Sequence, residues 1–143
     1  MTGIQKKLNS LASEVISDIS AYEKCIEFCG PISTGGLGNS IENIDCLKSF
    51  VDYAISLKYD VFNQLEYEKR FNDILGEPNG YDYDLLDFFY KPVIESGYIK
   101  QMIFLPNWED SYGCRWEMDM AKKNGISVVI LEDYTLNTLI KLN

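Results

Sequence analysis

The sequence predicts an α/β fold in which a parallel sheet of four to five strands is covered by helices on both faces. Short β-prone runs alternate along the chain with longer segments of helical periodicity. One of these runs, residues 126–131, is apolar throughout, as is typical of strands covered on both faces. With 143 residues, of which 46% are hydrophobic, the chain is expected to form one domain with a full core.

The first half of the chain is expected to contain two helices and two strands. Apolar residues at spacings of three and four predict an amphipathic helix over residues 3–22, which packs on the domain or on a partner subunit. Residues 25–29 form a β-prone run that a Gly-Pro pair ends, and a glycine-rich loop over residues 33–39 follows. A second helical repeat covers residues 41–57, and residues 60–63 indicate a brief second strand.

The second half continues the alternation of strands and helices. Helices are expected over 65–75, 81–95 and 113–124, strands over 99–105 and 126–131, and a last helix from Tyr134 onward. Pro92 should kink or interrupt its helix. This order predicts a flavodoxin- or Rossmann-like three-layer sandwich, a single domain of residues 1–143 in which residues 1–24 form an additional N-terminal helical extension.

Composition excludes several classes of function. The net charge is −9, the pI is about 4.4, and the thirteen Lys and Arg residues are scattered, so a nucleic acid partner is not expected. No apolar run reaches the roughly 20 residues of a membrane span, and the N-terminus lacks the apolar core of a secretory signal, which together predict a cytoplasmic protein without membrane contact.

The types of reactive side chain narrow the chemistry further. The chain has no histidine, which excludes Ser-His and Cys-His catalysis and argues against an ordinary catalytic zinc site. Acid–base chemistry must therefore come from carboxylates, tyrosines or lysines, and we expect no metal and no cofactor. The four cysteines form no C-x-x-C pair and are interpreted as buried free thiols.

Ligands of an open parallel sheet bind beyond the carboxyl ends of the strands, where the strand order reverses. Three loops are therefore candidate walls of a pocket: residues 30–39, the segment from Asn63 onward, and residues 106–113. Among the carboxylates nearby, Glu117 falls at the edge of the apolar face of its predicted helix, about one turn from the N-terminus. The helix dipole there favours an anion, which could attack an anomeric carbon. From position alone, however, the commoner interpretation is a surface residue that favours the first turn or pairs with Arg115 or Lys122.

Two segments resemble a known enzyme superfamily. Residues 105–117, LPNWEDSYGCRWE, with the helix and strand that follow, resemble the signature of the nucleoside 2-deoxyribosyltransferase superfamily, and most of all a domain of unknown function found there in bacteria and phages. Residues 28–36, FCGPISTGG, are similar to the phosphate-side loop of the deoxynucleoside 5′-monophosphate N-hydrolases. The similarity extends over residues 25–131, although only these two segments are specific.

The resemblance assigns roles to individual residues. Glu117 takes the place of the nucleophilic glutamate, and Asp87, or else Asp84, takes that of the acid that protonates the departing base. Either aspartate could equally be a solvated helix residue. Asp110 is a further candidate for the acid, or else a residue that only fixes the turn. Ser111 corresponds to a phosphate-binding serine, whose hydroxyl can donate to a phosphate that an aspartate would repel. The remaining substrate- or phosphate-binding candidates are Gly30, Ile32, Ser33, Gly35, Gly36, Asp110 and Gly113.

The resemblance implies an N-glycosidic bond hydrolase or a 2-deoxyribosyltransferase that acts on a nucleoside 5′-monophosphate. The alternatives are a non-catalytic nucleotide-binding or sensing module of the same fold, and an interaction protein built on this scaffold. A homodimer or larger homo-oligomer is also implied. Trp108 and Tyr112 could stack on a base or cover the pocket, and Trp108 and Trp116 could instead lie in a subunit interface.

Overall fold

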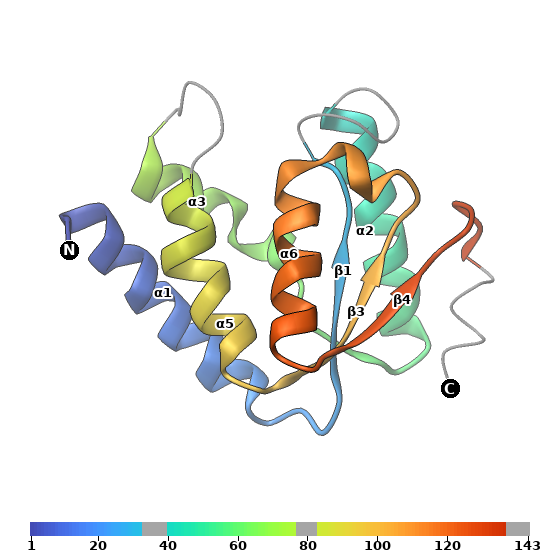
Figure 1. Cartoon of the computed structure of the whole chain (residues 1–143), viewed down its shortest axis with the longest axis horizontal. Helices are drawn as coiled ribbons and strands as arrows, with labels where there is room; N and C mark the ends of the chain where they lie inside the picture. Colours follow the sequence, from blue (N-terminus) through green and yellow to red (C-terminus); the bar gives the residue numbers. More distant parts are fainter. Residues whose placement is uncertain (33–39, 77–82, 137–143) are drawn as a thin grey trace.

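A parallel four-stranded sheet forms the centre of the computed structural model, which describes residues 1–32, 40–76 and 83–136 (Figure 1). The strands are β1 (Cys25–Cys29), β2 (Asp60–Val61), β3 (Ile99–Phe104) and β4 (Ser127–Ile130), arranged in the order β2-β1-β3-β4. The chain adds β2 on one side of β1 and then returns to add β3 on the other side. The strand order therefore reverses between β1 and β3, as in a flavodoxin- or Rossmann-like sandwich, and the predicted fold class is confirmed.

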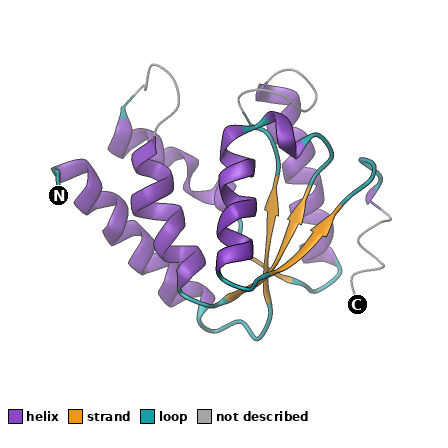
Figure 2. Cartoon of the chain, in the orientation of Figure 1, coloured by secondary structure: helices purple, strands orange, loops and turns teal. Residues whose placement is uncertain are grey.

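Helices cover both faces of this sheet (Figure 2). On one face, α2 (Ser40–Ser56) packs on Ile26 and Phe28 of β1. On the other face lie α6 (Tyr112–Lys123) and a group of helices from the N-terminal and middle parts of the chain, which pack on Cys25 and Cys29. Successive residues of β1 thus point to opposite faces, and all five are buried.

The N-terminal helix α1 (Gly3–Ile19) is part of the core. A capping box joins Thr2 and Gln5 at its start, which satisfies two backbone N–H groups of the first turn. Its buried stripe consists of Leu8, Leu11, Ala12, Val15 and Ile19. This stripe packs in the same cluster as Phe71 of α3 (Glu68–Leu75), which follows the short η1 helix (Gln64–Tyr67). The expectation that the first helix packs on the domain is confirmed.

The predicted interruption at Pro92 is also confirmed. Between α4 (Tyr83–Leu85) and α5 (Lys91–Glu95) the helix widens into a π-helical turn, η2 (Leu86–Tyr90), and the N–H of Lys91 donates to the carbonyl of Leu86, five residues earlier. Proline has no N–H to donate, and its ring would collide with the carbonyl four residues back. A π turn immediately before Pro92 relieves that collision without ending the helix.

The fourth strand corrects one expectation. Its apolar sequence suggested a strand covered on both faces, but β4 is the edge of the described sheet, and Ser127 and Ile130 are exposed. Only Val128 and Val129 are partly buried, one against each core cluster. An edge strand has one neighbour, so the helices of the two layers cover it less completely.

The last predicted helix falls largely on residues 137–143, outside the described residues. In the described part of the chain, no helix is both long and apolar enough to cross a membrane.

Candidate functional site

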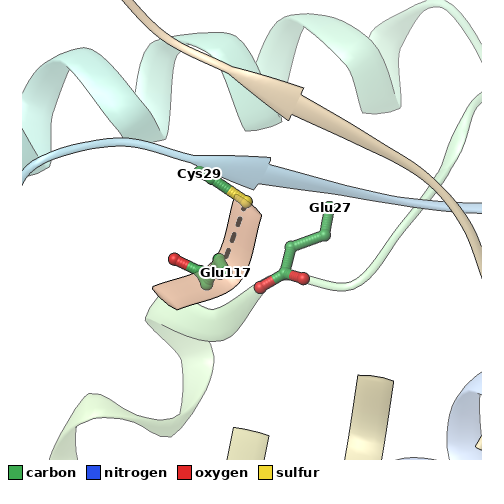
Figure 3. A group of neighbouring side chains, drawn as sticks. All are labelled: Glu27, Cys29 and Glu117. Atoms are coloured by element: carbon green, nitrogen blue, oxygen red, sulfur yellow. Dashed lines mark hydrogen bonds between the residues drawn. The ribbon is translucent and has the colours of Figure 1, made fainter. Parts of the chain in front are cut away.

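Three side chains with reactive groups meet between β1 and α6 (Figure 3). Glu27 and Cys29 lie two residues apart on β1 and therefore point to the same face of the sheet, toward Glu117 of α6. The Cys29 thiol donates a hydrogen bond to Glu117 Oε2 at 3.3 Å. One oxygen of each carboxyl and the Cys29 sulfur all lie within 4.8 Å of one another. We call Glu27, Cys29 and Glu117 the acid–thiol cluster.

The cluster lies where the fold places ligand sites. Cys29 is the last residue of β1 and pairs with Phe104, the last residue of β3. These are the two strands between which the strand order reverses. In open parallel sheets this is the position at which ligands bind. Cys29 therefore lies at the carboxyl edge at the switch point, and Glu27 lies two residues deeper in the same strand.

Glu27 is the most unusual member of the cluster. Its relative exposure is 0%, and within the described residues neither carboxyl oxygen has a partner at full hydrogen-bonding geometry, the nearest polar group being the carboxyl of Glu117. Burial raises the pKa of Glu27 well above that of an exposed glutamate, and the adjacent negative charge of Glu117 raises it further. Glu27 therefore keeps its proton to a higher pH than an ordinary surface carboxyl does.

Glu117 keeps part of its surface accessible, although its carboxyl lies among buried groups. Burial raises its pKa, while its contacts with Glu27 and Cys29 oppose that rise. Burial thus acts against the anionic form that the helix dipole was expected to favour. Glu117 is also the sixth residue of α6, beyond the first turn in which the dipole acts most strongly. The surface ion pair considered from the sequence does not form with Arg115, which donates instead to the backbone carbonyl of Glu109 at 2.6 Å.

The thiols around the cluster are held in their protonated form. Burial raises the pKa of Cys29 well above its usual value, and the charges of Glu117 and Glu27 add to this effect. Burial likewise raises the pKa of Cys114, and it raises the pKa of Cys25 to about 12. All four cysteines are free, and only Cys46 is partly exposed, so the expectation of buried free thiols is confirmed for the other three.

The two sequence-predicted loops flank the cluster, but their described residues also have local structural roles. Gly30 is buried, and a Cβ atom at this position would come within 3.1 Å of Leu105 Cδ2, so a larger residue there would press on the Leu105 side chain. The carbonyl of Ile32 accepts a hydrogen bond from Asn43 Nδ2 at 3.3 Å, which fixes the loop to α2. The candidates Ser33, Gly35 and Gly36 lie outside the described residues.

The turn before α6 is likewise well ordered by its own contacts. The Ser111 hydroxyl accepts a hydrogen bond from the N–H of Cys114 at 3.3 Å and caps the helix. Gly113 is buried in the first turn, and Asp110 is exposed at the end of the short η3 helix (Trp108–Asp110). Capping alone accounts for a serine at position 111, and the phosphate-binding role of Ser111 stays a prediction.

The two predicted acids do not join the cluster. Asp84 accepts a hydrogen bond from Gln5 Nε2 of α1 at 3.3 Å, and Asp87 is exposed on the π-helical turn. The structure instead brings Glu27 next to Glu117. Sequence reasoning did not select Glu27, although one signal was present: it is the single charged residue in the otherwise apolar run of residues 25–29. A charged residue inside a buried strand is rare without a partner or a function.

A groove of about 410 Å³ runs along the outer side of α6 and is lined by Trp108, Tyr112, Arg115 and Trp116, among others. Glu117 is not among its lining residues. The Trp108 ring packs edge-on against Phe104, with 5.4 Å between ring centroids, and both tryptophans are partly buried at the margin of the core. Their predicted contacts with a base or a partner subunit stay predictions.

Comparisons of the chain with family models, with curated proteins and with solved structures find no match.

Proposed function

We propose that this protein acts on the N-glycosidic bond of a nucleoside 5′-monophosphate, with Glu117 as the nucleophile. The observation that supports this proposal best is the pair of carboxyl groups, Glu27 and Glu117, whose oxygens approach within 4.8 Å at the switch point of the sheet. Glycosidases that retain configuration also use two carboxyl groups, about 5–5.5 Å apart, one of which attacks the anomeric carbon.

The reaction follows from this arrangement. The ionised carboxylate of Glu117 attacks C1′ of the sugar, the C1′–N bond breaks, and the base departs with the bonding electron pair and takes up one proton from solvent. Water then attacks C1′ of the glycosyl ester, which releases the sugar phosphate and one proton and restores the carboxylate. A second base in place of water would give a transferase.

A phosphate on the ligand is suggested by the neighbouring turn. Ser111 begins α6, whose first backbone N–H groups and dipole favour an anion. Gly30 and Ile32 start the loop that resembles a phosphate-side loop, and both lie at the same edge of the sheet, directly after β1. The ligand would then span from the turn at Ser111 to the carboxyl of Glu117.

The test is release of free base from deoxynucleoside and ribonucleoside 5′-monophosphates and from the corresponding nucleosides, measured by chromatography. Glu117→Gln should abolish release, because an amide cannot act as the nucleophile. Asp119→Asn is the matched control, since Asp119 is exposed on the same helix, and it should leave release unchanged. Activity that persists in Glu117→Gln contradicts the mechanism, and a base-exchange assay separates a transferase from a hydrolase.

A second candidate is a nucleotide-binding or sensing module that does not turn its ligand over. The separation of Asp84 and Asp87 from the acid–thiol cluster favours it, because neither of these two aspartates stands beside Glu117 to protonate a departing base. A thermal-shift screen against nucleosides and monophosphates detects binding to the folded state whether or not turnover occurs. A rise in the midpoint together with no base release over a long incubation supports the binding module.

A further inference from the structure

The Glu27 carboxyl lacks the partners that a buried polar group normally has. It is completely inaccessible, and both of its oxygens lack hydrogen bonds. Buried carboxylates in proteins are generally hydrogen-bonded, paired with a positive charge or bound to a metal. In the close-up, its carboxyl group is directed toward the hydrogen-bonded pair of Cys29 and Glu117 (Figure 3).

Within the described residues, no lysine or arginine forms an ion pair with this carboxyl. In residues 1–32, 40–76 and 83–136, the ion pairs of lysine and arginine join Lys48 to Asp52, Lys69 to Asp73 and Arg70 to Glu14, all on the surface. None of them involves the acid–thiol cluster. Three side chains that can each carry a negative charge therefore converge in the interior without a cation from the described part of the protein.

The three donor atoms suit one small cation. Zn²⁺ binds a cysteine sulfur at about 2.3 Å and a carboxylate oxygen at about 2.0–2.2 Å, so two ligands of a tetrahedral ion lie about 3.3–3.7 Å apart. Cys29 Sγ and Glu117 Oε2 are 3.3 Å apart, and the closest Glu27 oxygen lies within 4.8 Å of both. The Glu27 oxygen would have to move closer by up to about 1 Å to reach ligand spacing. Two of the three ligands come from one rigid strand, which fixes their spacing.

We propose that Glu27, Cys29 and Glu117 form a binding site for one divalent cation of the Zn²⁺ class. The absence of histidine removes the usual imidazole ligands, but thiolate and carboxylate groups are also established zinc ligands. The thiolate selects Zn²⁺ and Co²⁺ over Mg²⁺ and Ca²⁺, which prefer six or more oxygen ligands. Three protein ligands leave one coordination position for water or a ligand atom.

This site goes beyond the proposed function and bears on its regulation. Glu117 cannot bind the cation and attack a sugar at the same time, so the loaded protein should be inactive in the proposed reaction. Because cation binding can be measured without any substrate, the metal site can fail while the glycosidic activity stands, and the reverse also holds.

The experiment is a titration of the chelator-treated full chain with Co²⁺, followed by the near-ultraviolet charge-transfer band that a cobalt–thiolate bond produces. We expect the band to saturate at one equivalent and to disappear when Zn²⁺ is added, whereas excess Mg²⁺ should leave it unchanged. Cys29→Ser should abolish the band. Cys46→Ser, at a cysteine that packs with the cluster of residues on the opposite face of the sheet, is the matched control and should retain it.

A second variant tests the carboxyl ligand without removing the thiol. Glu27→Gln, which preserves the size of the side chain, should weaken Co²⁺ binding by at least about tenfold, since even changes next to a metal ligand have effects of this size. Circular dichroism confirms the fold of each variant. The proposal is overturned if the wild-type protein gives no cobalt–thiolate band, or if the band persists in a folded Cys29→Ser variant. Unchanged Co²⁺ affinity in Glu27→Gln excludes Glu27 as a ligand.

Discussion

Replacing Glu27 with methionine is expected to stabilise the metal-free protein. Glu27 is fully buried, and its two carboxyl oxygens have no hydrogen-bond partners. Leaving a buried polar group unsatisfied costs about 1–3 kcal/mol, and an apolar side chain of similar length avoids that cost. Methionine is unbranched and adapts to the space that a glutamate side chain fills. We therefore expect Glu27→Met to raise the free energy of unfolding by about 1–3 kcal/mol, or the melting temperature by roughly 3 °C for each kcal/mol.

The gain in unfolding free energy from Glu27→Met should increase as the pH rises. Burial raises the pKa of Glu27, so the folded state retains a proton at pH values where the unfolded chain has lost it. The stability that this proton contributes is fully present below the pKa of Glu27 in the unfolded chain. It is lost as the pH rises toward the higher pKa of Glu27 in the folded protein. The loss amounts to about 1.4 kcal/mol per pH unit for one retained proton. Glu27→Met removes this dependence, so its advantage over the wild-type protein should increase with pH.

The assay is urea unfolding between about pH 5 and about pH 8, in the presence of a chelator, for wild type, Glu27→Met and Glu27→Gln. Glu27→Gln cannot titrate but keeps a buried polar group, so it should share the flatter pH dependence and little of the gain at low pH. Glu95→Gln, at an exposed carboxylate, is the control and should behave as wild type. If Glu27→Met is instead less stable at every pH, Glu27 has a stabilising partner and the reasoning is refuted.

Four further predictions concern the surroundings of the cluster and the N-terminal helix. Gly30→Ala should destabilise the fold by about 1–3 kcal/mol through contact with Leu105, and shortening Leu105 to valine in the same chain should recover part of the loss; an unchanged unfolding midpoint in Gly30→Ala contradicts the packing role. Ser111→Ala should lower the free energy of unfolding by about 1 kcal/mol, because it removes the helix cap. Ser111→Asp should keep the cap and the stability but weaken any phosphate binding measured by thermal shift. Equal phosphate binding by both variants argues against a phosphate at this turn. In a brief alkylation followed by mass spectrometry, Cys46 should react before the other three cysteines, because its side chain is partly exposed and theirs are buried, although burial raises the pKa of all four thiols. Leu11→Ala should lower stability by about 2–5 kcal/mol in chemical unfolding, and a change below 1 kcal/mol would mean that α1 is only loosely attached.

The fold class was predictable because helical and strand periodicities alternate clearly along this sequence. The interruption of the helix at Pro92 was also predictable, since the missing N–H of proline acts on the adjacent turn. The exposure of β4 was not predictable in the same way. An apolar run has the same sequence whether it occupies the centre or the edge of a sheet, and only the strand order places Ile130 at the exposed edge.

The candidate site was only partly predictable for a related reason. The helical projection and the resemblance both led to Glu117, but the charge state of its carboxyl depends on burial, which residues distant in sequence create. The partner of Glu117 is separated from it by 90 positions and comes from another element. Asp84 and Asp87 were reasonable candidates from their register in a regular helix, yet the π-helical turn that Pro92 requires changes the register at this segment.

Glu27 is also the residue that best separates a structural from a functional interpretation of the cluster. A carboxyl group maintained only for packing should be replaceable by methionine without loss of any property. If Glu27 binds a cation or acts beside Glu117, the Glu27→Met variant should instead gain stability and at the same time lose Co²⁺ binding or base release. Protein sites commonly show this exchange of stability for function. Because the stability gain is measured without metal or substrate, it can be compared directly with both losses in the same variant, and the loss that accompanies it identifies which of the two roles Glu27 has.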